Sequence, residues 1–222
     1  ERAERAFLLN PPASPSLNTD QEERETARSI LKAISQTNLK KIVVQSTYGA
    51  QEGAHCGDLG VLYEFERDAE QSRVPLCIVR AAYYMSNWLP SLILAKQTRI
   101  LSSLLPSDLK VPMVAPQDVG KLAARLLSDP VNETGIYNIE GPEYYTTSDV
   151  AGCFSKHLSR DISVSAVPRA DWYDYYKTQG FSDEAAHSYT NMTEIFVGQR
   201  YELPQNTVKG ETTLSAYFDK EL

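Results

Sequence analysis

Cysteine and histidine are scarce in this sequence of 222 residues, which has three of each. No two cysteines have the Cys-x-x-Cys spacing, and no histidine has a partner at a ligand spacing. This argues against a disulfide framework, a metal site and an Asp-His-nucleophile triad, and we expect no bound metal. The six residues are Cys56, Cys77, Cys153, His55, His157 and His187.

Long apolar runs and clusters of positive charge are also absent. No run approaches the roughly 20 apolar residues of a membrane-spanning helix, so we expect no membrane span. The 22 basic and 29 acidic residues give a net charge of -7. Proteins that bind nucleic acids depend on clustered Lys and Arg, so nucleic acid is not an expected partner. With few cysteines and no recognisable signal peptide, we expect a cytoplasmic protein.

The sequence does contain an alternation of strand-like and helical segments. Short apolar, often β-branched runs predict buried strands at 7–9, 41–47, 76–80 and 135–139. Apolar residues at helical spacing predict helices from a cap at 18–20 to about residue 36, over 61–69 and over 118–127. This order is typical of the α/β class, with a doubly wound parallel sheet.

From residue 141 onward the pattern becomes mostly helical. Thr146 and Asp149 have the spacing of a capping box, which predicts a helix that begins there. A short strand is predicted at 162–167, and helical spacing returns after it. We therefore predict a sheet domain over 1–140 and a small, mostly helical cap over 141–222.

Three predicted strands are followed by polar or aromatic residues. In an open parallel sheet, ligands bind beyond the carboxyl ends of the strands. Ordinary loop chemistry explains any one of these segments, but three of them at corresponding positions favour a ligand site. The segments are 10–12, 46–48 and 82–87.

Five segments, in order, resemble the NmrA-like family, an atypical branch of the short-chain dehydrogenases/reductases. The resemblance covers essentially the whole chain. It implies a Rossmann domain that binds NADP(H) or NAD(H), NADP being favoured, and a C-terminal cap over a small substrate pocket. The segments that carry it are 79–88, 7–12, 43–47, 114–120 and 137–143, the last followed by 146–150.

The glycine-rich loop with which such proteins open, Gly-x-x-Gly-x-x-Gly after a first strand, is missing here. The sequence also starts with Glu1 rather than Met, close to a predicted core strand. We therefore expect a partial Rossmann domain that lacks its N-terminal strands, as in a fragment. The alternative is a variant that has lost the phosphate site. An uncovered sheet edge would favour pairing with itself, as a homodimer, or with a protein partner.

The resemblance also implies cofactor-binding residues at the three strand ends. The segment after the first strand would lie along the adenosine and linking phosphates of the cofactor, mainly through its backbone. The end of the strand at 41–47 would lie beside the nicotinamide ribose, and the segment after the strand at 76–80 would line the nicotinamide. Tyr83 and Tyr84 could equally be hydrophobic plugs between sheet and cap. The nine residues are Leu9, Asn10, Pro11, Ser46, Thr47, Tyr84, Met85, Ser86 and Asn87.

Tyr63 and Arg67 are the candidate catalytic pair. The superfamily uses a Tyr with a Lys four residues later, where the Lys lowers the phenol pKa. Aligned on Glu70, however, the family pattern places Glu66 at the Lys position, and a carboxylate cannot replace an ammonium group beside a ribose. The alternative is that Tyr63 is a half-buried helix residue without a catalytic role.

Three functions follow from these expectations. The first is an NAD(P)-dependent oxidoreductase that transfers hydride to or from a small carbonyl or quinone-type acceptor. The second is a dinucleotide-binding redox sensor that reports to a protein partner without efficient turnover. The third is a degenerate chain that binds no cofactor.

Overall fold

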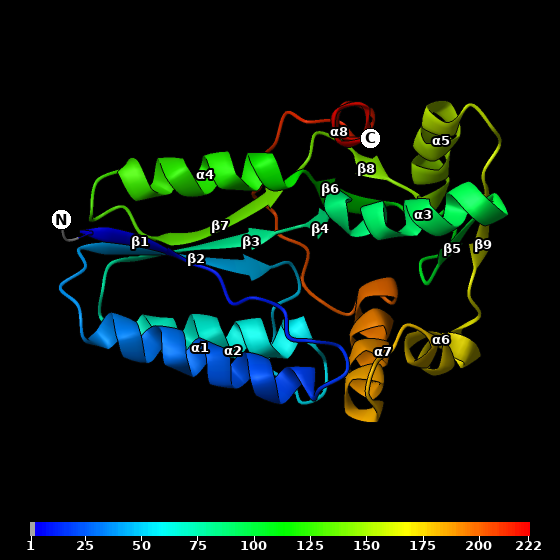
Figure 1. Cartoon of the computed structure of the whole chain (residues 1–222). Coiled ribbons are helices and arrows are strands. Elements are labelled where there is room, and N and C mark those ends of the chain that lie inside the picture. The colour runs from blue at the N-terminus through cyan, green and yellow to red at the C-terminus, as the bar shows by residue number, and fades with distance from the viewer. Residues whose placement is uncertain (1–2) are drawn as a thin grey trace.

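The computed structural model describes residues 3–222 and contains a five-stranded parallel sheet (Figure 1). The strand order is β1-β2-β3-β7-β10, and every neighbouring pair is parallel. All residues of β2 except the last are buried, which explains its continuous apolar run. The five strands are β1 (Arg5–Leu8), β2 (Lys41–Thr47), β3 (Leu76–Ala81), β7 (Gly135–Glu140) and β10 (Val208–Lys209).

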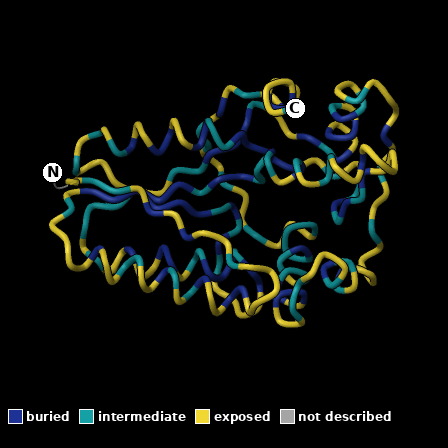
Figure 2. The backbone as a smooth tube through the Cα atoms, in the orientation of Figure 1, coloured by how far each residue is buried: buried dark blue, intermediate teal, exposed yellow. Residues whose placement is uncertain are grey.

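Helices cover both faces of this sheet. On one face lie α1 (Thr19–Ser35) and α2 (Asp58–Gln71), and on the other lies α4 (Pro116–Ser128) (Figure 1). In β2, Val44 faces the core under α1 and α2, whereas Val43 faces the core under α4. The alternation of side chains along the strand therefore supplies both cores. Figure 2 shows buried strands between helices whose outer faces are exposed.

The remaining elements form a second region beyond the carboxyl ends of the strands (Figure 1). Three short strands form one sheet, β4 (Tyr83–Tyr84), β6 (Val111–Val114) and β8 (Tyr144–Tyr145). Two more strands pair in parallel, β5 (Ile100–Ser103) and β9 (Ser163–Ala166). The helices are η1 (Met85–Trp88), α3 (Leu89–Thr98), α5 (Thr147–Leu158), η2 (Arg169–Asp171), α6 (Trp172–Thr178), α7 (Asp183–Val197) and α8 (Leu214–Glu221).

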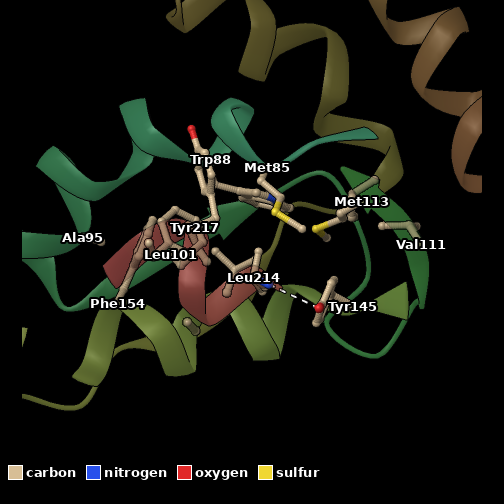
Figure 3. Close-up of a cluster of buried hydrophobic side chains, with 14 of the residues drawn as sticks. Met85, Trp88, Ala95, Leu101, Val111, Met113, Tyr145, Phe154, Leu214 and Tyr217 are labelled. Atoms are coloured by element: carbon tan, nitrogen blue, oxygen red, sulfur yellow. Dashed lines mark hydrogen bonds between the residues drawn. The ribbon is translucent and has the colours of Figure 1, made fainter. Parts of the chain in front are cut away.

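This second region has its own hydrophobic core (Figure 3). Phe154 of α5 and Phe218 of α8 lie edge to face, with ring centroids 5.2 Å apart. The Leu214 backbone N–H donates to the Tyr145 hydroxyl at 3.2 Å, which ties α8 to β8. Met85 is fully buried in the same core. The segment that follows β3 therefore contributes to the core of the second region.

Two strand pairs cross the predicted domain boundary at residue 140. Ile100 of β5 pairs with Ser163 of β9, and Val208 of β10 pairs with Ile139 of β7. The division into 1–140 and 141–222 stays a prediction. The chain enters the second region three times, after β3, after β7 and after β10.

The predicted fold class is confirmed, since the structure is α/β with a parallel central sheet. The capping box of Thr146 and Asp149 is present at the start of α5. The first strand ends at Leu8, one residue earlier than predicted. Within the described chain β1 pairs only with β2, and Phe7 on it is 42% exposed.

Candidate functional site

The carboxyl ends of β1, β2 and β3 lie side by side because the strands are parallel and in register. Leu8 pairs with Val44, and Thr47 pairs with Ala81. The segments that leave these strands therefore begin at one edge of the sheet, the edge that faces the second region (Figure 1). Open parallel sheets bind their ligands at this edge.

The segment after β1 combines exposed and buried groups. Leu9 is 53% exposed and Pro11 is exposed, but Asn10 between them is only 8% exposed. The Asn10 side-chain amide donates to the Glu23 carbonyl oxygen at 3.1 Å. Its Oδ1 is buried and has no hydrogen-bond partner among the described residues. This leaves a buried acceptor for which residues 3–222 provide no donor.

The end of β2 has a similar feature. Ser46 is 2% exposed, and its hydroxyl has no partner in the part of the chain that the structure describes. The neighbouring Thr47 is half-buried, and its hydroxyl donates to the Tyr48 carbonyl oxygen at 3.3 Å. Orphaned polar atoms thus lie at or next to the ends of two adjacent strands. A ligand with hydrogen-bonding groups fits such a place.

The segment after β3 presents fewer side chains than its sequence suggests. The Met85 side chain is fully buried in the core of the second region, so only its backbone remains for a ligand (Figure 3). Asn87 is exposed, while Ser86 and Tyr84 are half-buried. Burial raises the pKa of Tyr84 to about 12, so its phenol stays protonated at neutral pH.

Tyr83, the other tyrosine of β4, packs against aromatic side chains of η1 and α7. Its ring centroid lies 5.7 Å from that of Trp88 and 5.6 Å from that of Phe196 on α7. Phe196 in turn stacks on Tyr201 at 6.0 Å. Burial raises the pKa of Tyr83 well above its ordinary value. These contacts agree with the structural interpretation of Tyr83.

Tyr63 and Arg67 lie on α2 beside the loop that contains Glu52 and Gly53, in a small polar hollow. The residues that line this hollow include none of the strand-end residues. Tyr63 is half-buried, and Arg67 is exposed and forms an ion pair with Glu70 at 2.8 Å. The structure thus places the pair beside each other and outside the strand-end segments.

Glu66, on the same helix, is buried. It is 2% exposed, and its carboxylate accepts two hydrogen bonds from the Arg80 guanidinium, at 2.9 and 2.6 Å. This bidentate pair joins α2 to β3. The Glu66 carboxylate is therefore already bound to a side chain of the central sheet.

The structure contains two buried groups of polar residues that the sequence did not predict. The first surrounds Glu140 at the end of β7, which accepts from the Tyr48 hydroxyl at 3.3 Å and pairs with Lys209 of β10. Burial is the main cause that raises the pKa of Tyr48. No spacing links residues 48, 140 and 209, so only the folded chain brings them together.

The second group is acidic and lies at the start of α1 and α2. Asp20 and Glu23 are 6% and 4% exposed, and Asp58 is the first residue of α2. The Ser188 hydroxyl of α7 donates to Asp20 at 2.7 Å and accepts from the Gly57 backbone N–H at 2.8 Å. These residues join the second region to both helices.

An apolar hollow lined by Leu76, Ile78 and Ile136 lies at the amino-terminal ends of β3 and β7, the edge opposite to the strand-end segments.

Residues 3–222 contain no group of three or more His, Cys, Asp or Glu that could hold a metal ion. None of their helices is both long and apolar enough to cross a membrane.

Comparison with models of protein families shows to which family the chain belongs. The model of the NmrA-like family matches residues 14–217, which is most of the chain. The chain belongs to the NmrA-like family. A search of curated proteins found no match for this NmrA-like chain.

Solved structures share the fold of this NmrA-like protein at low sequence identity. The NADPH-dependent quinone oxidoreductase of Escherichia coli, complexed with NADPH, is 18% identical, with a TM-score of 0.71 over 97% of this chain and 75% of that one. The triphenylmethane reductase of Citrobacter, complexed with NADP(H), is 14% identical, with a TM-score of 0.76 over 99% and 76%. NmrA, a negative transcriptional regulator, is 15% identical, with a TM-score of 0.61 over 89% and 62%.

Proposed function

We propose that this NmrA-like chain binds a nicotinamide dinucleotide along the carboxyl ends of β1, β2 and β3. The observation that carries the proposal is a pair of buried atoms at adjacent strand ends, Asn10 Oδ1 and Ser46 Oγ, which have no hydrogen-bond partner among residues 3–222. Buried polar atoms nearly always have a partner, and ribose hydroxyls and amides of a dinucleotide would supply one. The NADPH and NADP(H) bound by two structural relatives support this ligand class.

Each strand end has a proposed role. Leu9, Asn10 and Pro11 would pass the adenosine and linking phosphates, and the exposure of Leu9 and Pro11 leaves their backbone free for this. Ser46 and Thr47 would contact the nicotinamide ribose. The last segment would line the nicotinamide through the side chains of Tyr84, Ser86 and Asn87 and the backbone of Met85.

The proposed reaction is hydride transfer to or from a small carbonyl or quinone-type acceptor, with NADP preferred on the resemblance. The bound dinucleotide supplies or accepts the hydride, and the acceptor oxygen exchanges a proton with the protein. Tyr63 is the proposed proton donor and Arg67 its cationic neighbour. The support for this pair is the resemblance to the superfamily pattern, a Tyr with a basic residue four positions later.

A second function, a dinucleotide-binding redox sensor, is favoured by the Glu66–Arg80 pair. At the position where the family pattern has its Lys, this chain has a buried carboxylate that is already bound to a guanidinium. That arrangement supplies no ammonium group for the ribose or the phenol. A sensor of this kind would report the state of the dinucleotide to a protein partner.

Calorimetric titration of the chain with NADPH and NADH tests the binding proposal, and NADPH oxidation with quinone and aldehyde acceptors then separates the two functions. Binding with turnover supports the oxidoreductase, and binding without turnover supports the sensor. Asn10→Ala should weaken binding about tenfold, as expected for a lost buried hydrogen bond. Asn132→Ala is the matched control, because Asn132 is exposed at the opposite edge of the sheet. Absence of binding to either dinucleotide overturns the proposal.

A further inference from the structure

Helix α3 has apolar side chains on its outer face as well as on its inner face. Leu89, Leu92 and Ala95 belong to the core of the second region. Ile93 and Leu94, which lie between them in the sequence, are 69% and 50% exposed. A helix that is apolar all round is normally covered on all sides. The outer face of α3 therefore has the composition of a contact surface.

Strand β5 extends this apolar surface beyond the end of the helix. The Thr98 hydroxyl donates to the Leu94 carbonyl oxygen at 2.9 Å and accepts from the Ile100 backbone N–H at 3.2 Å. These bonds hold Ile100, which is 40% exposed, next to the last turn of α3, where the helix lies beside β5 (Figure 1). We call the surface formed by Ile93, Leu94 and Ile100 the α3 face.

Three cations lie at the carboxyl end of the α3 face. Lys96 lies in the last turn of α3, Arg99 follows the helix, and the Arg160 guanidinium donates to the Lys96 carbonyl oxygen at 3.3 Å. All three are exposed, and none forms an ion pair within residues 3–222. One acidic residue, Asp161, adjoins Arg160 in the sequence, so the local charge remains positive. This end of the α3 face thus complements an acidic group, although the chain as a whole has a net charge of -7.

We propose that the α3 face is a docking site for an acidic, amphipathic segment of a protein partner. Apolar side chains of the partner would cover the three exposed apolar residues, and its carboxylates would pair with the three cations. An anionic membrane fits less well, because it would present its charge to a whole side of an acidic chain. A short acidic segment meets only the basic end of the face.

The place of α3 in the chain also favours a protein partner. Trp88 ends η1 and Leu89 begins α3, so the helix directly follows the segment that is proposed to line the nicotinamide. A partner on the α3 face would therefore contact the element next to that segment. For this link the inference rests on the proposed function, in its form as a redox sensor.

Fluorescence anisotropy with two labelled synthetic peptides tests the docking directly, with no dinucleotide present. Both peptides are helical and have the same stripe of Leu residues, which is flanked by Glu in one peptide and by Lys in the other. The wild-type chain should bind the Glu peptide about tenfold more tightly than the Lys peptide, because only the Glu peptide complements the three cations. Equal binding of the two peptides, or no binding of the Glu peptide, overturns the inference.

Two variants separate the apolar and the charged part of the surface. Ile93→Ser should weaken binding of the Glu peptide about tenfold, since it removes the most exposed apolar side chain of the face. Lys96→Glu should weaken it about tenfold at low salt and by less at high salt. The matched controls are Leu203→Ser, an exposed apolar residue elsewhere, and Lys32→Glu, an exposed lysine of α1. Both controls should bind as wild type, and wild-type affinity in Ile93→Ser or Lys96→Glu overturns the inference.

The same variants distinguish other occupants of the α3 face. Co-sedimentation with phosphatidylserine vesicles that is lost in Lys96→Glu would assign the face to a membrane. A dimer in light scattering that dissociates in Ile93→Ser would assign it to a second copy of the chain. Either result overturns the inference. If NADPH and NADH do not bind, the proposed function fails, while the peptide titration still decides whether the α3 face is a docking site.

Discussion

Glu66 of α2 and Arg80 of β3 form a bidentate ion pair in which the carboxylate is 2% exposed and the guanidinium side chain 24%. The pair lies between α2 and the central sheet, so each charged group has the other as its main source of compensating charge. Removing one member leaves the other buried without compensation, which costs more than the pair contributes.

Glu66→Ala should therefore lower the free energy of unfolding by about 2–3 kcal/mol, below the usual cost of breaking a buried pair because Arg80 retains some solvent contact. Urea denaturation followed by circular dichroism measures this change. Glu70→Ala is the control on the same helix, because its ion pair with Arg67 is exposed and should be worth less than about 1 kcal/mol. Equal effects of the two variants would contradict the buried role of Glu66.

Ser46→Ala separates a ligand role from a structural one. Since the buried Ser46 hydroxyl has no hydrogen-bond partner in the described part of the chain, its removal should leave the free energy of unfolding within about 1 kcal/mol of wild type or raise it. If the hydroxyl binds the dinucleotide, NADPH affinity should fall by about two- to tenfold. Thermal unfolding and calorimetric titration measure the two quantities, and unchanged affinity would remove Ser46 from the site.

Tyr63→Phe tests the proposed proton donor. The loss of the phenol hydroxyl should reduce turnover by about a hundredfold and leave the Kd for NADPH unchanged, as expected for a general acid that does not bind the dinucleotide. Stopped-flow measurement of NADPH oxidation follows the chemical step. Turnover equal to that of wild type would assign Tyr63 to the structure of α2.

Stability should fall as pH rises because the folded-state pKa of Glu23 is raised, from 4.5 to about 8. The folded protein then binds a proton that the unfolded chain has already released, so unfolding becomes more favourable from about pH 4.5 up to about pH 8. Denaturation at a series of pH values measures this loss. Glu23→Gln should show a flatter profile than Glu22→Gln, and parallel profiles would contradict the assignment.

Tyr48→Phe should lower the free energy of unfolding by about 1 kcal/mol. The variant removes the hydroxyl that donates to the buried Glu140 carboxylate at 3.3 Å and keeps the ring, which is 4% exposed. Chemical denaturation measures the difference. Tyr173→Phe is a control with an exposed tyrosine–carboxylate bond, to Asp183, and should have a smaller effect.

Local patterns in the sequence were sufficient for most of the sheet and its helices. The apolar run of β2, the stripe of α1 and the capping box of α5 each depend on residues within about two helical turns, so spacing alone reveals them. The two-residue strand β10 has no such pattern. It exists because Val208 lies beside Ile139 in the folded chain.

In the candidate site, too, some features follow from local sequence patterns and others only from the tertiary structure. The sequence by itself determined that polar residues follow three parallel strands and that the chain resembles NmrA-like proteins, because both features are local. Only the tertiary structure decided that Met85 is buried, that Glu66 is bound to Arg80, and that Glu23 lies against Ala13 and beside Asp58. Burial and charge pairing depend on residues far apart in the chain, and these determine which side chains a ligand can reach and which carboxyl groups are protonated.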